Sequence, residues 1–186
     1  MNSNIEAHNI KISLKIKTPH ISYISKVITK NQKKILHKNF GNFIVVYSNF
    51  KYIFFNTKNN ILHCNVTKIK KYNQIYLSKK ELKYYFPKLN IISTQVDNIC
   101  ATKITNGNID LEILFKDLVK YNSLKFKVNY NSQKFPGLFI KFYKKFIFGT
   151  LIIFKSGKIN YVGLKSPNDF VRLDEWVNKW IHYVWS

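Results

Sequence analysis

Residues 135–165 carry the clearest structural signal in this chain, and they read FPGLFIKFYKKFIFGTLIIFKSGKINYVGLK. Apolar side chains alternate there with lysines and other polar residues, in the two-residue rhythm that is typical of β-strands. Ser156-Gly157 lies between two such runs and is a strong signal for a hairpin turn. The stretch therefore predicts antiparallel strands near residues 138–144, 147–155 and 158–164.

Charge is distributed unevenly along the chain. Asp and Glu are absent between Glu6 and Glu81 and again between Asp117 and Asp169, and both stretches are rich in lysine. Because the acidic residues fall mainly in segments with helical spacing, we expect positive charge alone on the sheet, one face of which is then a candidate surface for a polyanion. The alternative is that these lysines are the solvated face of a two-layer fold, in a chain whose Lys, Asn and Ile content is typical of an AT-rich genome.

Helix-capping signals and a short dipeptide recur at a nearly constant interval. The matching signals are Thr18-Pro19 and Asn108, 90 residues apart; the capping boxes Ser78-Glu81 and Ser166-Pro167-Asp169, 88 apart; and Asn9-Ile10 and Asn98-Ile99, 89 apart. The common interval indicates a duplicated unit, with the first repeat at 1–89 and the second at 90–186.

Each repeat is predicted to contain a strand, a helix, several strands and a second helix. The remaining strands are expected near 8–16, 35–39, 42–48, 50–57, 60–66, 92–102 and 123–129, with a turn at Asn59-Asn60. This order predicts an α+β fold in which four amphipathic helices cover one face of a long antiparallel sheet. The opposite, lysine-rich face would remain open.

The composition favours a nucleic-acid partner. The formal net charge is +22, from 31 Lys and Arg against 9 Asp and Glu. No segment approaches the roughly 18 apolar residues of a membrane span, and the start of the chain lacks the apolar core of a signal peptide, so we expect an intracellular protein without a membrane partner. Cys64 and Cys100 form no CxxC pair, which argues against a disulfide framework and a zinc site.

Signals for catalysis are weak throughout the sequence. The five histidines lack HxxxH or HExxH spacing, and the adjacent acids Asp174 and Glu175 would point apart on a helix. Neither a Walker loop nor a GxSxG motif occurs. We therefore expect no enzyme activity, no catalytic or metal-binding residues and no cofactor.

The second half resembles a known family. FPGL at 135–138, an apolar strand that ends in Phe154, SGK at 156–158 and GLK at 163–165 follow one another as in the second repeat of the TATA-binding protein family. The resemblance implies a saddle, in which a long curved antiparallel sheet carries four helices on its convex face and its concave face binds the minor groove of AT-rich promoter DNA.

The resemblance also implies roles for individual residues. Phe135 and Phe154 would be a wedge between base steps, and lysines would face phosphates. Asn9 and Asn98 would be a central pair that reads minor-groove acceptors. The implied DNA-binding residues are Asn9, Lys11, Phe40, Phe55, Asn98, Phe135, Pro136, Leu138, Lys141, Thr150, Ile152, Phe154, Lys158, Asn160 and Val162.

The sequence departs from the family pattern at three places. In the first repeat Phe40 matches one wedge residue and either Phe55 or Thr57 the other; Phe55 is preferred because a wedge needs a flat apolar side chain. The 19-residue spacing from Phe135 to Phe154 is two longer than expected, which predicts an extended turn around Lys144-Lys145. The acidic residues that precede FPGL in the family are replaced by residues 131–134, which read NSQK.

The family resemblance implies a general transcription initiation factor that acts as one chain per DNA site. It would recruit a transcription factor B-like protein and RNA polymerase, in the nucleus or in a cytoplasmic virus factory. Two other interpretations remain: a degenerate protein-binding scaffold, and a single-stranded nucleic-acid binder that stacks bases on the aromatic sheet.

Overall fold

The computed structural model describes residues 6–17, 21–30, 36–56, 61–121, 124–143 and 147–181. Some predicted features lie outside these residues: the helix start at Thr18-Pro19, the wedge alternative Thr57, the turn at Asn59-Asn60 and the turn at Lys144-Lys145.

The chain divides into two compact units. The first unit holds Asn9–Asp97, and the second holds the described residues from Asn98 onward together with the beginning of the first strand. This division falls inside a strand, whereas the predicted repeat boundary lies between Leu89 and Asn90, where that strand begins. As a statement about the duplicated sequence, the boundary stays a prediction.

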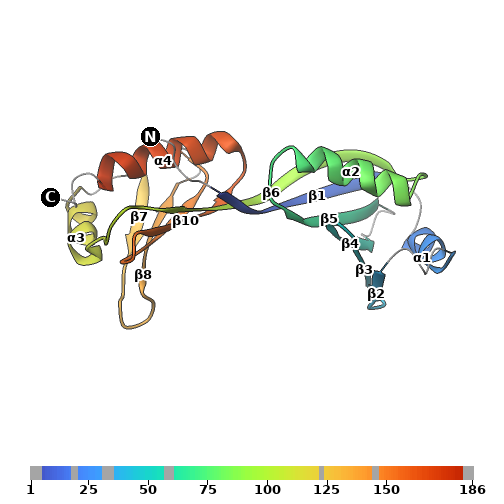
Figure 1. The fold of residues 1–186 in the computed structure, drawn as a ribbon, viewed down its shortest axis with the longest axis horizontal. Helices are drawn as coiled ribbons and strands as arrows, with labels where there is room; N and C mark the ends of the chain where they lie inside the picture. The colour runs from blue at the N-terminus through green and yellow to red at the C-terminus, as the bar shows by residue number, and fades with distance from the viewer. Residues whose placement is uncertain are drawn as a thin grey trace. The chain divides into compact units, whose positions relative to one another are not determined.

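Each half of the chain contains one strand, a helix, four more strands and a second helix, in that order (Figure 1). The first half contains β1 (Glu6–Lys17), α1 (Ile21–Lys30), β2 (Leu36–Asn39), β3 (Phe43–Tyr47), β4 (Lys51–Asn56), β5 (Ile61–Ile69) and α2 (Gln74–Tyr85). The second contains β6 (Asn90–Ile104), α3 (Leu111–Tyr121), β7 (Phe126–Asn129), β8 (Gly137–Phe142), β9 (Thr150–Phe154), β10 (Lys158–Leu164) and α4 (Pro167–Ile181).

The strands follow the order β2-β3-β4-β5-β1-β6-β10-β9-β8-β7 in the described part of the chain. Neighbouring strands within each unit pair antiparallel, for example β4 with β5 and β8 with β9. The predicted α+β fold, with an antiparallel sheet and four helices in the described residues, is therefore confirmed.

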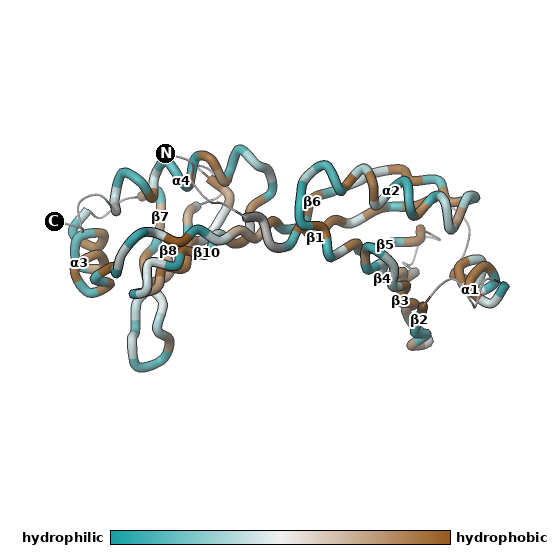
Figure 2. Tube along the Cα trace, viewed as in Figure 1, coloured by the Kyte–Doolittle hydropathy of each residue, from teal (hydrophilic) through white to brown (hydrophobic). Residues whose placement is uncertain are grey.

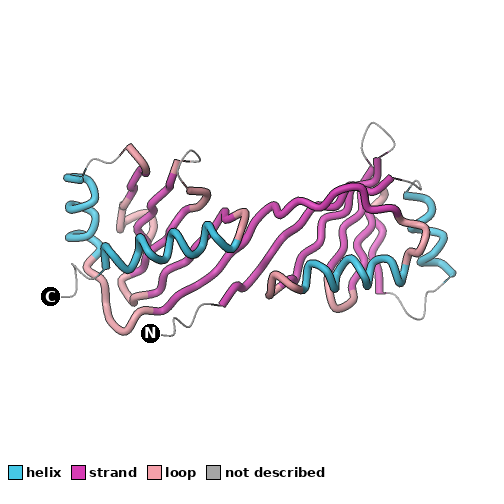
Figure 3. Tube along the Cα trace, turned by 90° about the horizontal axis from the view of Figure 1, so that it is seen from above, coloured by secondary structure: helices cyan, strands magenta, loops and turns pink. Residues whose placement is uncertain are grey.

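Helices cover one face of the sheet in each unit (Figure 3). In the first unit α2 packs on β5 and α1 on β4; in the second α4 packs on β10, and α3 on β7 and β8. Alternate strand residues are buried beneath them, such as Ile12 and Leu14 in β1 or Ile159 and Tyr161 in β10. We call the opposite side of each unit's sheet its open face; Figure 2 shows hydrophobic and hydrophilic positions alternating along the strands.

The observed starts of two helices, α2 and α3, differ from the predicted ones. α2 begins at Gln74, four residues before Ser78, which is fully buried in the helix and donates a hydrogen bond to the Ile75 carbonyl. α3 is capped by Asp110, whose Oδ1 accepts bonds from the N–H groups of residues 112 and 113, so Asn108 is not its cap. At α3 a neighbouring side chain performs the capping that the pattern assigned to Asn108. At α2 the N-cap residue, Asn73, makes no side-chain capping hydrogen bond.

The predicted capping box of α4 is confirmed. The Asp169 N–H donates to Ser166 Oγ at 3.2 Å, and the Ser166 N–H donates to Asp169 Oδ2 at 2.9 Å. Replacing Ser166 with Ala should lower the free energy of unfolding by about 1 kcal/mol. Urea denaturation measures this loss; Glu175→Ala, an exposed change on the same helix, is the control and should shift the midpoint far less.

No helix of the described residues is long and apolar enough to cross a membrane.

Candidate nucleic-acid interface

The open face of the second unit carries one row of side chains across five strands. Asn129, Phe139, Ile152, Asn160 and Thr102 are successive register partners on β7, β8, β9, β10 and β6. The Thr102 hydroxyl donates to Asn160 Oδ1 at 2.9 Å. The row combines two apolar side chains, Phe139 and Ile152, with two amides, which can form hydrogen bonds with acceptors and donors on base edges.

The predicted wedge lies beside this row. The rings of Phe135 and Phe154 have centroids 5.9 Å apart, and Phe135 also lies 5.0 Å from Phe139. Phe135 remains 38% exposed. A glycine makes this approach possible: a Cβ on Gly137 would lie 2.7 Å from Phe135 Cε1 and 3.2 Å from Phe154 Cε1. The two rings therefore meet directly above Gly137.

Gly137→Ala should displace the Phe135 ring, because no real Cβ approaches a ring carbon that closely. We expect duplex affinity to fall about tenfold, which corresponds to about 1.4 kcal/mol. Fluorescence anisotropy measures the affinity. In a Phe135→Ala background, Gly137→Ala should cost almost nothing further, since the displaced ring is gone; additive losses would contradict the assignment.

The first unit repeats the second in register. Ser13, Asn65, Ile53, Val45 and Lys38 form the matching row on its open face. A bulge interrupts the pairing in both units, and Lys68 with φ 66° occupies the place of Gly163 with φ 81°. With the bulges and rows aligned, Phe55 is the counterpart of Phe154, because each lies two residues beyond the isoleucine of its row.

The first wedge is built differently from the second. Phe43 occupies the register position of Gly137, opposite Phe55. Phe40, which is 53% exposed, stacks on Phe43 with ring centroids 4.7 Å apart, and Phe55 stacks on His63 at 5.6 Å. The structure therefore pairs Phe40 with Phe43, a residue that sequence reasoning missed. Its place becomes evident only from the sheet register, which puts it opposite Phe55.

Leu138, a predicted DNA-binding residue, lies in the core of the second unit. Its side chain is fully buried and pairs in register with Ile153, on the side of β8 that the helices cover. The motif places Leu138 three residues after Phe135, but on strand β8 its side chain points into the core. Leu138 is therefore not part of the open face.

The other predicted residues remain on the open faces or near them. Lys141, Lys158 and Pro136 are exposed, and Thr150, Ile152 and Val162 are half-buried. Asn9 is exposed. Asn98 is half-buried and held at the bulge, because its Oδ1 accepts the Gly163 N–H at 2.8 Å. Their contacts with DNA stay predictions.

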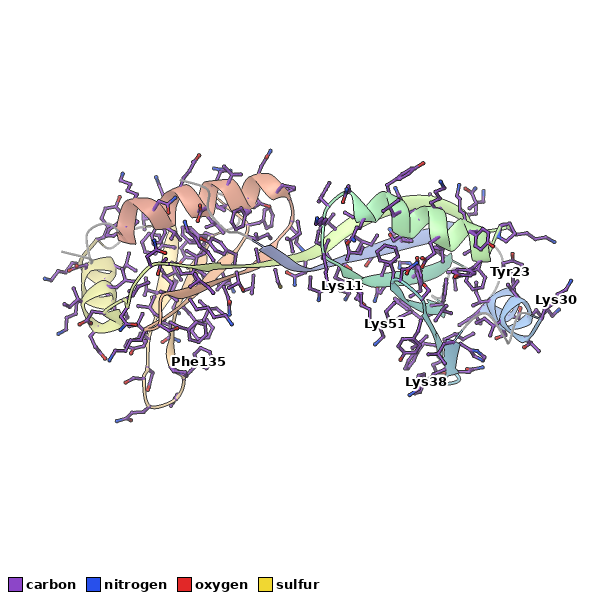
Figure 4. All side chains as sticks on the ribbon, viewed as in Figure 1. Lys11, Tyr23, Lys30, Lys38, Lys51 and Phe135 are labelled. Carbon is purple, nitrogen blue, oxygen red and sulfur yellow. The ribbon has the colours of Figure 1, made fainter. Side chains whose placement is uncertain are left out.

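Lysines line the open faces. In the second unit Lys127, Lys141 and Lys158 are exposed, and in the first unit Lys15, Lys17 and Lys38 are. Figure 4 shows Lys11, Lys51 and Lys38 on the side of the first unit's strands away from α2. The Lys51 ammonium lies 5.6 Å from the centre of the Tyr47 ring. Exposed lysines of this kind can contact phosphates on a DNA-binding face.

Two carboxylate side chains, those of Asp174 and Glu81, accept hydrogen bonds on the helix-covered side of the sheet. Tyr161 donates to Asp174 Oδ1 at 2.7 Å, as does Lys103 at 2.8 Å. In the first unit, Glu81 accepts hydrogen bonds from Tyr52, Ser48 and Asn49. Burial, aided by the neighbouring carboxylate, raises the pKa of each tyrosine well above its usual range, so both hydroxyls remain donors.

The expectation that the strands carry positive charge alone is wrong at two positions, because Glu6 lies in β1 and Asp97 in β6. Both cysteines are free, with Cys64 buried. Among the described residues, His, Cys, Asp and Glu form no group of three that could hold a metal ion.

Comparison with known proteins agrees with this geometry. Residues 93–179 match the family model described as "Transcription factor TFIID (or TATA-binding protein, TBP)". Over these residues the chain is similar to the TATA-binding protein family. The match covers the part of the chain that holds the row, the Phe135–Phe154 wedge and most of α4.

A curated relative and a solved structure extend the comparison. The chain is 32% identical over 79 residues to the TATA-box-binding protein of Aeropyrum pernix, a stretch that covers 42% of this chain and 34% of that protein. The chain thus matches about a third of the length of this relative. The structure titled "Methanococcus jannaschii TBP" superposes with a TM-score of 0.68 at 18% identity, over 97% of this chain and 99% of that one, which shows a shared fold.

Proposed function

We propose that this protein is a TATA-binding-protein-like transcription initiation factor that binds and bends AT-rich duplex DNA through its minor groove. The observation that carries the proposal is the open face of the second unit. There the exposed Phe135 contacts the half-buried Phe154, and this pair adjoins a row of apolar and amide side chains bordered by lysines. The match of residues 93–179 to the TATA-binding protein family model and the similarity to the Aeropyrum pernix protein support it.

The chemistry of the row suits this groove. The minor groove mainly distinguishes A·T from G·C pairs, so Asn and apolar side chains suffice to read it. Flat rings that insert between base steps unstack and kink the duplex at a cost of a few kcal/mol, which new contacts with the bent DNA repay. The lysines add affinity that is independent of sequence and falls steeply with salt.

Lys158→Ala tests the phosphate contacts. This exposed lysine adjoins the wedge strand, so its loss should weaken binding to all duplexes and flatten the plot of log affinity against log salt by about one unit. Anisotropy with an AT-rich duplex and with a single strand, at several salt concentrations, measures the slope. Lys116→Ala on α3 removes the same charge away from the open face and should leave the slope unchanged. Preference for the single strand would favour the stacking function instead.

We further propose that one chain occupies one DNA site and recruits a divergent transcription factor B-like protein, and through it RNA polymerase. Asn131, Gln133 and Lys134 are exposed, and Lys134 lines a shallow pocket of about 190 Å³ beside Phe135. An acidic or neutral partner surface suits these groups. Lys134→Glu should weaken capture of such a partner on DNA; two chains per minimal site in light scattering would contradict the stoichiometry.

A further inference from the structure

His63 occupies the position in the first unit that Lys158 occupies in the second. Each lies two residues before the asparagine of its row, which is Asn65 on β5 and Asn160 on β10. Each also lies five residues before the residue of positive φ at the bulge of its unit. Two landmarks therefore align the two strands in the same way, and they put an imidazole where the second unit has an ammonium group.

The His63 side chain lies on the open face of the first unit. Its neighbours in β5, Leu62 and Cys64, are 1% and 0% exposed on the side that α2 covers, whereas His63 is half-buried on the other side. On β4 its register partner is Phe55, and the two rings stack with centroids 5.6 Å apart. The imidazole therefore lies beside the counterpart of the wedge residue Phe154.

The charged groups that face His63 from the neighbouring strands are positive. On β1 its register partner is the exposed Lys15, and Lys17 lies two residues further along the same side. On β4 the uncharged Phe55 faces it, and neither β4 nor β5 contains an Asp or Glu. Asp97 lies on β6, beyond β1 in the strand order. A protonated imidazole here adds to a positive patch that a phosphate can neutralise.

We propose that His63 is a phosphate-contacting residue of the first unit, and that it makes this contact in its protonated form. This rests on the duplex-binding function proposed above, in which Lys158 contacts a phosphate in the second half of the site. Both ring nitrogens of an imidazolium donate hydrogen bonds, and a charged donor makes the stronger bond to a phosphate. A neutral imidazole has one donor and no charge, so the contact weakens when the proton is lost.

Duplex binding should therefore depend on pH through the first unit. An unperturbed histidine changes its charge near about pH 6.5. Below that pH the charged form of His63 adds its contact, so affinity is high at about pH 5.5 and falls as the pH rises to about 8. Lysines are protonated throughout this range, so the contacts of the second unit do not fall with it.

Fluorescence anisotropy with an AT-rich duplex, at about pH 5.5 and about pH 8, tests this contact. His63→Gln keeps a hydrogen-bonding side chain that cannot take up a proton. At about pH 5.5 it should bind about tenfold more weakly than the unaltered protein, with a plot of log affinity against log salt that is flatter by about one unit. At about pH 8 the loss should be less than about twofold.

His63→Lys separates the charge from the stacking, because a lysine stays charged at both pH values. It should bind about tenfold more tightly than the unaltered protein at about pH 8, a gain that a residue serving only to support the Phe55 ring would not give. His37→Gln is the matched control, since the register partner of His37 is the buried Val46, on the helix-covered side. Its affinity should stay within about twofold of the parent's at both pH values.

Thermal melting at each pH shows whether the variants are folded, and if His63→Gln is not, His63→Lys decides the question. An equal loss at both pH values in His63→Gln, or no gain at about pH 8 in folded His63→Lys, would overturn this inference while the duplex-binding function stood. Failure of the unaltered protein to bind any duplex at either pH would overturn both.

Discussion

Replacing Phe135 and Phe154 together by Ala is expected to weaken duplex binding roughly a hundredfold, about 3 kcal/mol, while the melting temperature of the free protein changes little. Each ring gives up apolar burial against the bases, and the wedge that opens the base step is lost. Folding is spared because Phe135 lies on the open face, where its ring packs against Phe139 and Phe154. Anisotropy and thermal melting measure the two effects.

A core phenylalanine is the matched control. Phe142 is 5% exposed and packs against Phe126 and Trp176. Phe142→Ala should lower the free energy of unfolding by about 3–5 kcal/mol. If the Phe135/Phe154 variant instead melts as far below the parent as Phe142→Ala does and keeps its DNA affinity, those rings are core residues and the wedge assignment is wrong.

Asp174→Ala is expected to lower the free energy of unfolding by about 3–5 kcal/mol, because it leaves the ammonium of Lys103 buried without its counter-charge. The side chains of Lys103 and Asp174 are 13% and 12% exposed, and their atoms lie 2.8 Å apart. Tyr161 loses its acceptor in the same change. Urea denaturation measures the loss.

The double variant Lys103→Met/Asp174→Leu separates charge from packing. It removes both charges at once, so most of the stability should return relative to Asp174→Ala. A double variant as unstable as the single one would show that the hydrogen bond from Tyr161, and not the unpaired charge of Lys103, accounts for the loss.

Strand alternation and repetition were enough to predict the fold. Each predicted strand has a counterpart in the structure, because one buried face imposes a two-residue period that is visible in the sequence. Helix starts were less certain. Ser78 and Glu81 match a capping box, yet Glu81 reaches across to Ser48 and Tyr52, and the helix begins at Gln74. Short patterns cannot distinguish a local bond from one that crosses to another element.

Site residues were predicted correctly where the motif and the alternation of side chains along the strand place a residue on the same face of the sheet. Phe135 and Phe154 meet at 5.9 Å as expected. Leu138 belongs to the same motif but is buried, because its direction depends on pairing with Ile153, which is a tertiary property. The Phe40–Phe43 stack depends on which residue replaces Gly137 in the first unit, and this is evident only once the sheet register is known.

The most direct test of the central claim is energy transfer between dyes at the two ends of a short AT-rich duplex, measured as the protein is added. The proposed wedge and lysine-lined open face predict that transfer rises to a plateau at one chain per duplex, because the kinked DNA brings its ends together, and that the Phe135→Ala/Phe154→Ala variant gives a much smaller rise at saturation. Saturation of the duplex by the unaltered protein with no change in transfer would contradict it.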